Sequence, residues 1–343
     1  MFHRTKYQIE RGLRRANAEL SRPFHQAQEP SSESNKTTSH YPSLPQDSIR
    51  LFRIQSADGD TAICRLETYP RRIAPRYDAV SYCWGDDTTP ATIQVNEHDL
   101  QIRKSLLAFL TASLDRNPPL RPLWIDAICL NQDDDVEKAD HIPLMGQIYK
   151  NASRTIVWLG EADEDTHRTL VFMKGVISVT REYNMMVGIG KEDGYQPEWE
   201  AVRRYMRRAW FGRLWVMQEV LLSENIEILC HAQPINVITW KELLQFEHSL
   251  QKYNGYSNLL DDNSEDNDIS PDGAPHLIEI LRVSHRRSGR LHMWYFNEFH
   301  GLKKCTEPVD RVWALLGLLS PKFIAMVNEA RIIDYGDAGR RDY

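Results

Sequence analysis

The residues best suited to chemistry follow two short apolar runs in the first half of the chain. Asp86 comes just after the run at 77–84, and Asn131 and Gln132 come just after the run at 123–130. Carboxylates and amides are unusual in an apolar core. Ligands of open α/β sheets bind outside the carboxyl ends of the strands. The spacing therefore predicts a polar site built by the loops that follow two strands.

Two residues within these runs are candidates for the same site. Trp84 offers an aromatic face beside the flexible Gly85 and the acceptor Asp86. Asp126 lies inside an apolar run, where an ionised carboxylate is costly unless it is hydrogen-bonded or paired. Asp126 therefore either lines a ligand cleft or caps backbone amides of the following loop. For Asn131, turn formation is the alternative to ligand binding.

Neither a metal site nor a disulfide framework is indicated. The five cysteines are odd in number and include no Cys-x-x-Cys pair, which fits a reducing cytosol and predicts a cytoplasmic protein. His141 and His167 have no partner at metal-ligand spacing, so we expect no metal and no bound cofactor. Cys83 and Cys129 lie in apolar runs and are expected to be inert core thiols.

An alternation of strands and helices must position these side chains. Apolar, β-rich runs separated by helical patterns are typical of an α/β fold with a largely parallel sheet. Strands are expected at 77–84, 123–130, 155–159 and 226–230, with hairpins at 49–54/62–66 and 92–95/100–102. Helices are expected at 106–114, 136–152, 166–183, 198–222, 240–253 and 277–283. Pro143 requires the second of these helices to begin near it or to kink.

Composition divides the 343 residues into parts. The net charge of −6 gives no basic excess for nucleic acid, and no apolar run is long enough to span a bilayer. We expect a disordered basic and polar arm at 1–47, a folded core at 48–253, an acidic flexible insertion at 254–275 and a helical extension at 276–343. The arginines at 203, 204, 207 and 208 are expected to form a solvated or salt-bridged helix face, with a phosphate or partner contact as the alternative.

Several blocks of the chain resemble the fungal heterokaryon incompatibility (HET) domain. They are Tyr77-Asp-Ala-Val-Ser-Tyr-Cys-Trp-Gly-Asp86, Leu123-Trp-Ile-Asp-Ala-Ile-Cys-Leu-Asn-Gln132, Ile156-Val-Trp-Leu-Gly160, Trp210-Phe-Gly-Arg-Leu-Trp-Val-Met-Gln-Glu-Val220 and Asp310-Arg-Val-Trp-Ala-Leu-Leu-Gly317. The resemblance covers roughly residues 48–320 and makes 48–253 the core of a HET domain. It implies a role in fungal non-self recognition and the triggering of cell death.

More distantly, the chain resembles Toll/interleukin-1 receptor (TIR) domains, which have a flavodoxin-like sheet. The segment 77–82 is similar to the TIR opening strand, and Asp86 matches the acidic residue after it. Trp215-Val-Met-Gln-Glu219 is similar to a TIR segment whose glutamate is catalytic in enzymes that cleave NAD. The resemblance therefore implies that Glu219 is catalytic, with NAD as the substrate. The stretch between Gly160 and Trp215 is longer than in a TIR domain.

Cleavage of nicotinamide from NAD passes through an oxocarbenium-like ribosyl cation, which a nearby carboxylate can stabilise. Trp215 and Glu219 are four residues apart and would share one helix face, where the indole could stack on a ring. The alternative is that Trp215 belongs to the core and Glu219 pairs with Arg213 or Arg208 on the surface.

Two functions are consistent with these observations. The first is an NAD-hydrolysing cell-death effector that assembles as a homo-oligomer on activation, with a sensor or incompatibility protein as a partner. The second is a non-catalytic adaptor that assembles homotypically in the same pathway. In the first, Trp84, Asp86, Asp126, Asn131, Gln132 and Trp215 would shape the substrate site around Glu219.

Overall fold

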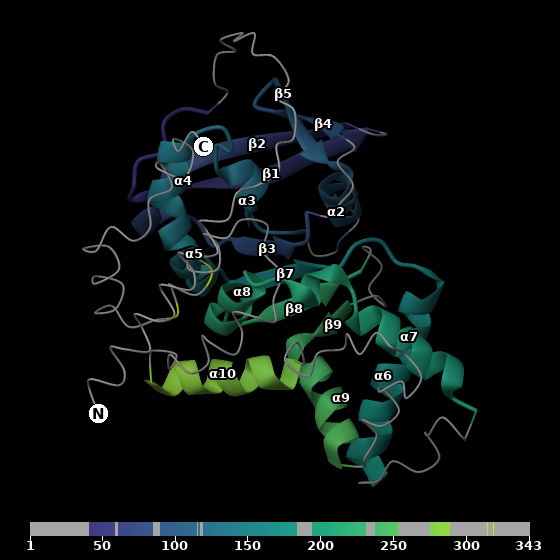
Figure 1. The fold of residues 1–343 in the computed structure, drawn as a ribbon. Helices are drawn as coiled ribbons and strands as arrows, with labels where there is room; N and C mark the ends of the chain where they lie inside the picture. The colour runs from purple at the N-terminus through teal and green to yellow at the C-terminus, as the bar shows by residue number, and fades with distance from the viewer. Residues whose placement is uncertain are drawn as a thin grey trace, which may run out of the picture.

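The fold is centred on one nine-stranded mixed sheet (Figure 1). The computed structural model describes residues 41–58, 61–84, 90–114, 116, 119–183, 194–230, 237–252 and 275–288, with Ala314 and Leu318. Residues 1–40 of the predicted arm at 1–47 and 254–274 of the predicted insertion at 254–275 lie outside the described residues, as do Asp86 and most of the predicted C-terminal extension.

The strands follow the order β5-β4-β2-β1-β6-β3-β7-β8-β9 across the sheet. Their bounds are β1 Ser48–Asp58, β2 Thr61–Pro70, β3 Asp78–Tyr82, β4 Pro90–Val95, β5 His98–Arg103, β6 Leu123–Trp124, β7 Arg154–Trp158, β8 Ile226–Leu229 and β9 Val237–Thr239. The fold is therefore α/β, as the alternating pattern predicts.

Four adjacent strands, β6, β3, β7 and β8, are parallel to one another. Numbered along the chain within this group, their spatial order is 2-1-3-4, which is the strand order of flavodoxin-like sheets. In such sheets the order reverses beside the first strand, and ligands bind at the carboxyl ends of the strands there. In this protein the reversal lies between β3 and β7, just beyond Tyr82 and Trp158.

The two predicted hairpins are integral parts of the sheet. β1 and β2 are longer than the alternation indicates, and β1 pairs antiparallel with β6 through Phe52 and Leu123. β4 and β5 join through Asn96 and Glu97, whose φ angles of 50° and 70° match the tight primed turns that connect hairpins. The Asn96 side chain also exchanges hydrogen bonds with the backbone of Leu66, which extends the contact between β2 and β4.

Helices cover both faces of the central strands. Their bounds are α2 Lys104–Leu114, α3 Asp126–Cys129, α4 Asp135–His141, α5 Met145–Asn151, α6 Glu164–Tyr183, α7 Gln196–Met206, α8 Val216–Leu222, α9 Trp240–Lys252 and α10 Pro275–Ser288. Figure 1 shows α2 and α5 on opposite sides of the central strands, and α6, α7 and α9 grouped near the β9 end.

Alternation along β3 and β7 decides what each helix touches. Ser81 and Val157 are neighbours in the parallel register and share the face that α8 covers. Trp158 points to the other face, where its indole nitrogen donates to the Ser105 carbonyl at 3.1 Å and its ring packs against Phe109. Ser81 is thereby the polar side chain that β3 presents to α8.

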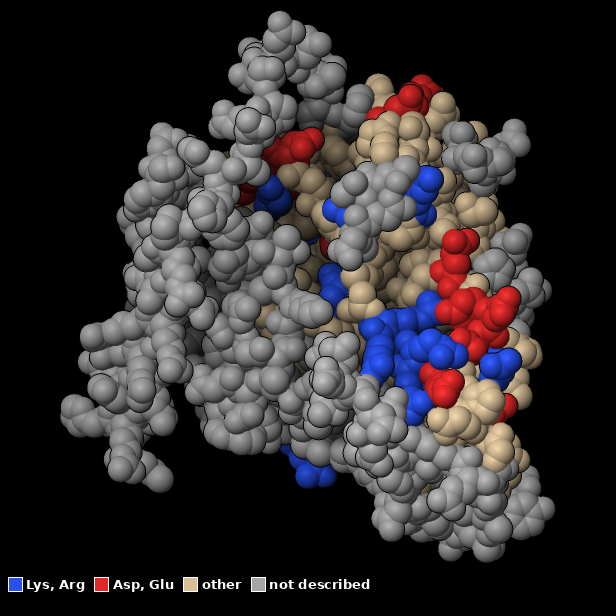
Figure 2. All heavy atoms as spheres, turned by 45° about the vertical axis from the view of Figure 1, so that its right-hand side comes forward, with Lys and Arg blue, Asp and Glu red and all other residues tan. Residues whose placement is uncertain are grey.

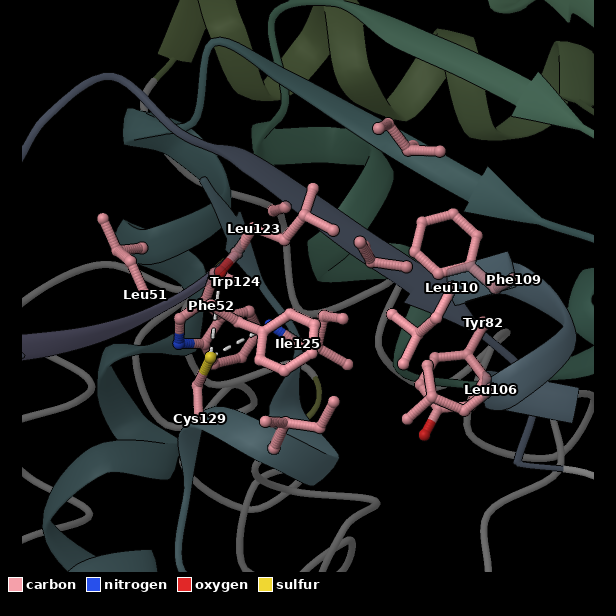
Figure 3. Close-up of a cluster of buried hydrophobic side chains, with 14 of the residues drawn as sticks. Leu51, Phe52, Tyr82, Leu106, Phe109, Leu110, Leu123, Trp124, Ile125 and Cys129 are labelled. Carbon is pink, nitrogen blue, oxygen red and sulfur yellow. Dashed lines mark hydrogen bonds between the residues drawn. The ribbon is translucent and has the colours of Figure 1, made fainter. Parts of the chain in front are cut away.

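The expected strand at 123–130 is wrong beyond Trp124. β6 has two residues, and the backbone then turns into the one-turn helix α3, with the amides of Ile128 and Cys129 donating to the Ile125 carbonyl. Figure 3 shows the Cys129 thiol beside Leu123 and Ile125, where the sulfur accepts a hydrogen bond from the Ile125 amide and donates one to the Leu123 carbonyl. A buried helical turn is as apolar as a buried strand, so the composition does not distinguish them.

Pro143 breaks the predicted helix at 136–152 into pieces. α4 ends at His141, a short 3₁₀ turn covers Ile142–Leu144, and α5 begins at Met145. α5 then packs closely on α8, because a Cβ on Gly146 would lie 2.8 Å from Leu222 Cδ1. The absence of a side chain at Gly146 lets α8 approach this closely.

A buried ion pair joins β1 to the segment after β6. Arg50 and Glu137 are nearly inaccessible and form two contacts, at 2.5 Å and 2.8 Å. Arg50 also donates to the Cys129 carbonyl at 3.2 Å, and its guanidinium lies 4.9 Å from the Tyr41 ring centre. Glu137 accepts from the Asn131 amide at 2.7 Å. This pair therefore fixes the loop that follows α3.

Removal of Arg50 is expected to be strongly destabilising. Arg50→Ala leaves Glu137 buried without its partner and should lower the free energy of unfolding by about 3–5 kcal/mol. Chemical denaturation followed by circular dichroism measures this difference. Arg65→Ala, which breaks the exposed pair with Glu67, is the matched control and should cost about 1 kcal/mol or less. Equal losses in the two variants would contradict the structural role of Arg50.

Candidate active site

Glu219 lies at the carboxyl end of β3, in the interior. It belongs to the seven-residue helix α8 and is 2% exposed. Its Oε2 accepts a hydrogen bond from the Ser81 hydroxyl of β3. The carboxylate therefore points at the strand next to the reversal of strand order, and the expected alternative of a surface position is wrong.

Arg213 and Trp210 complete the immediate surroundings of Glu219. Arg213 Nη1 lies 3.8 Å from Glu219 Oε1 and donates to the Tyr82 carbonyl at 2.6 Å. Trp210 Nε1 donates to the Ser81 hydroxyl oxygen at 2.6 Å. The pairing of Glu219 with Arg213 is thus present, but inside the protein, whereas Arg208 pairs elsewhere, with Asp163 at 2.9 Å.

Burial and charge act in opposite directions on these groups. Burial raises the pKa of Glu219, the Arg213 charge and the Ser81 hydrogen bond oppose the rise, and the Asp126 charge adds to it. Burial disfavours the charged form of Arg213, but Glu219 and Asp126 outweigh it and raise the pKa of the guanidinium. The site therefore holds one cation, Arg213, near two carboxylates, Glu219 and Asp126. The pKa of Glu219 depends on the charges of both Arg213 and Asp126.

Asp126 is the more accessible carboxylate of the site. It is half-buried at the first position of α3, where Oδ1 accepts from the Ala127 amide at 2.8 Å and Oδ2 accepts from Trp84 Nε1 at 3.3 Å. Burial raises the pKa of Asp126, and Arg213 opposes the rise. The structure therefore shows the amide-capping role of Asp126, whereas its role in a ligand cleft stays a prediction.

Trp84 joins Asp126 to the rim of the site. Its indole donates to Asp126, and the Arg103 guanidinium lies 5.7 Å from the ring centre. Trp84 is half-buried, like Asp126 and Arg103. An aromatic face between an arginine and a carboxylate can stack on a flat ring and hold it in one orientation.

The other predicted site residues differ in their contacts. Gln132 Nε2 donates to the Asp126 carbonyl at 2.9 Å and so supports α3. Asn131 takes the turn-forming role, because its Oδ1 accepts from the Asp133 amide at 3.2 Å. Trp215 precedes the first residue of α8. It packs against two clusters of buried apolar side chains, one that includes Val220 and one that includes Tyr149. Asp86 lies outside the described residues.

Sequence reasoning did not single out Ser81, Trp210 or Tyr149. Ser81 occurs in the first HET-like block and Trp210 in the fourth, yet no spacing rule brings them together, since they are 129 residues apart. Tyr149 of α5 donates to the Val80 carbonyl at 3.1 Å, and burial raises its pKa, with Glu219 and Asp126 adding to the rise. A polar residue on an otherwise apolar strand was the available signal for Ser81.

The remaining candidates have ordinary roles. Cys129 is fully buried and burial raises its pKa to about 12, as expected of a core thiol, whereas Cys83 is half-exposed, contrary to the prediction.

On the face that Figure 2 brings forward, basic and acidic side chains lie side by side. Among the predicted arginines, Arg204 of α7 pairs with Asp165 at 2.6 Å, and Arg208, which follows α7, pairs with Asp163, which confirms the salt-bridged interpretation.

Two features are absent from the described residues. Their histidine, cysteine, aspartate and glutamate side chains form no group of three or more that could hold a metal ion. Within the same part of the chain, no helix combines the length and the apolar composition needed to cross a bilayer.

The class of protein defined by this geometry is an α/β protein of flavodoxin-like strand order, with a carboxylate–arginine cluster at the carboxyl ends of its parallel strands. Residues 77–219 match the family described as heterokaryon incompatibility protein (HET). The chain therefore contains a HET domain, and the match ends at Glu219.

A comparison with curated proteins agrees with this assignment. The chain is 31% identical over 230 residues to heterokaryon incompatibility protein 6, OR allele, of Neurospora crassa. The matched region covers 54% of this chain and 33% of the relative, so the chain spans about a third of that protein's length. No solved structure matches the chain.

The raised pKa of Glu219 predicts that the free energy of unfolding depends on pH. A carboxyl whose pKa is higher in the folded state stabilises the fold at low pH, and this contribution is lost as pH rises from 4.5 through the folded-state pKa. Glu219→Gln removes that loss, so its free energy of unfolding relative to the wild type should increase with pH over this interval. Urea denaturation at a series of pH values measures the difference.

Glu67 supplies a control of opposite sign. The Tyr69 hydrogen bond lowers the pKa of Glu67, so its contribution to stability is present above pH 4.5 and is lost as pH falls. Glu67→Gln should therefore lose stability relative to the wild type as pH rises. A difference between Glu219→Gln and the wild type that is constant across pH would refute the interior environment of Glu219.

Proposed function

We propose that the chain is an effector of cell death in fungal non-self recognition that acts in the cytosol by hydrolysing NAD at its nicotinamide–ribose bond. The observation that carries the proposal is the position of Glu219, a carboxylate held by Ser81 and Arg213 beside the reversal of strand order. The HET match and the incompatibility protein of Neurospora crassa support the biological role.

The proposed reaction uses Glu219 in its ionised form, because the nicotinamide leaving group needs no proton. The bond between ribose C1′ and the nicotinamide nitrogen breaks, its electron pair leaves with the ring, and the cationic pyridinium departs as neutral nicotinamide. Water adds to the ribosyl cation and releases a proton. Glu219 would stabilise the cation in the transition state, where charge develops. Trp84 and Asp126 would orient the substrate at the partly exposed rim.

Access to Glu219 requires a change in the site. Glu219 is nearly inaccessible, and Arg213 lies against its Oε1. Displacement of Arg213 by a substrate or by assembly would expose Oε1 while Ser81 still held Oε2. This requirement fits activation by homo-oligomerisation, because it keeps the separate chain inactive.

The same burial favours a second candidate function. An interior glutamate that accepts from Ser81 and pairs with Arg213 can serve only to join α8 to β3. The chain would then be an adaptor that assembles homotypically without catalysis. Activity measurements separate the two functions.

Replacement of Glu219 tests the enzymatic proposal. Glu219→Gln in the full chain should lower nicotinamide release from NAD by about 100-fold or more, since a positioned group that stabilises transition-state charge contributes on this scale. Product chromatography with assembled, purified protein measures the rate. Glu227→Gln is the matched control, because Glu227 lies at the amino-end side of the sheet, pairs with Arg154 at 2.6 Å, and should leave the rate within about 3-fold.

Two outcomes would overturn the enzymatic assignment. Unchanged turnover in Glu219→Gln would remove Glu219 from the reaction. Absence of NAD loss in the wild type under every assembly condition, together with retained assembly, would establish the adaptor function instead.

A further inference from the structure

One hydroxyl proton determines how Glu219 is oriented. The Ser81 oxygen lies between Trp210 Nε1, at 2.6 Å, and Glu219 Oε2. An indole nitrogen can only donate, so Ser81 must accept from Trp210. Ser81 keeps its own proton for another partner and donates it to Oε2, which can only accept when Glu219 is ionised.

We propose that Ser81 and Trp210 are positioning residues that commit Oε2 of Glu219 to accepting a hydrogen bond, so that Glu219 exchanges its proton and meets substrate only through Oε1. The catalytic part of this proposal rests on the proposed function, whereas the hydrogen-bonding part does not. All three side chains are nearly inaccessible, so solvent does not replace these contacts.

The charges that face Glu219 explain why such a device matters. Arg213 favours the ionised carboxylate, whereas Asp126 of α3 disfavours it, and Tyr149 of α5 is close enough for its own titration to respond to Glu219. Burial also disfavours the ionised form. If substrate displaced Arg213, the Ser81 hydrogen bond would be the contact still favouring the carboxylate.

The consequence for the reaction is a directed carboxylate. A hydrogen bond to an ionised acceptor is stronger than one to a neutral group, so Ser81 lowers the pH above which Glu219 is charged. With Oε2 hydrogen-bonded to Ser81, Oε1 is the atom on the Arg213 side, and in the proposed reaction it would face the developing ribosyl cation. Activity should therefore appear as pH rises through the titration of Glu219.

The experiment measures that titration directly in the full chain. Carbon-13 NMR of glutamate-labelled protein reports each carboxyl carbon, and Glu219→Gln identifies the Glu219 resonance by its loss. In Ser81→Ala the midpoint should rise by about one to two pH units, the equivalent of a hydrogen bond to a charged group. Trp210→Phe should raise the midpoint less, because the Ser81 hydroxyl remains but no longer accepts the Trp210 hydrogen bond that orients it toward Glu219.

Matched substitutions separate positioning from a general loss of packing. Ser113→Ala removes a buried hydroxyl that donates to the Phe109 carbonyl at 2.6 Å, and Trp158→Phe removes a buried indole nitrogen that donates to Ser105. Both should leave the midpoint of Glu219 within about 0.3 pH units, since neither contacts the carboxylate. Trp210→Phe also keeps a ring against Phe211, so it tests the proposal even where Ser81→Ala fails to fold.

The acidic limb of the rate of nicotinamide release against pH is the second readout, and it should move with the NMR midpoint. A midpoint unchanged in both Ser81→Ala and Trp210→Phe would overturn the positioning proposal. If the midpoint rises in the two variants while the wild-type protein shows no NAD turnover, the hydrogen-bonding geometry is supported and the enzymatic function is overturned. The two failures are therefore distinguishable.

Discussion

The hydrogen bond from Ser81 to Glu219 is the contact around which the centre of the molecule is arranged. It brings a carboxylate from α8 to an interior strand, where an ionised group needs partners to be tolerated. Arg213 supplies the opposite charge and Trp210 orients the hydroxyl, so the loop before α8 must return to the end of β3. Gly146 of α5 permits the close approach of α8 that this requires.

The fold could be predicted from the sequence where the signal is local. The apolar strand at 77–84, the turn at Asn96 and the break at Pro143 each follow from the residues themselves. Asp126 was singled out because a carboxylate inside an apolar run is conspicuous, and Trp84 because it ends an apolar run beside Gly85 and Asp86. The strand at 123–130 failed because a buried helical turn has the same composition.

Contacts between distant residues could not be predicted in this way. Arg50 and Glu137 are 87 residues apart, and either side chain alone is typical of a solvated surface. The same holds for Glu219, whose spacing from Trp215 indicated a helix face but not an interior one. Only the family resemblance pointed to Glu219, and only the three-dimensional structure shows Ser81 and Arg213 beside it.

The C-terminal end of α8 lies beyond the region that defines the family. The match ends at Glu219, whereas α8 continues to Leu222, and Arg282 of α10 donates to the Ser223 and Glu224 carbonyls at 2.6 Å and 2.8 Å. β8 then pairs along β7, and β1 pairs with β6 from before the match begins. The segment that matches the family model is therefore smaller than the sheet to which it belongs. A fragment cut at 77 and 219 would end inside α8 and expose the strand edges of β6 and β7, so the matched residues alone leave unpaired backbone groups that invite aggregation.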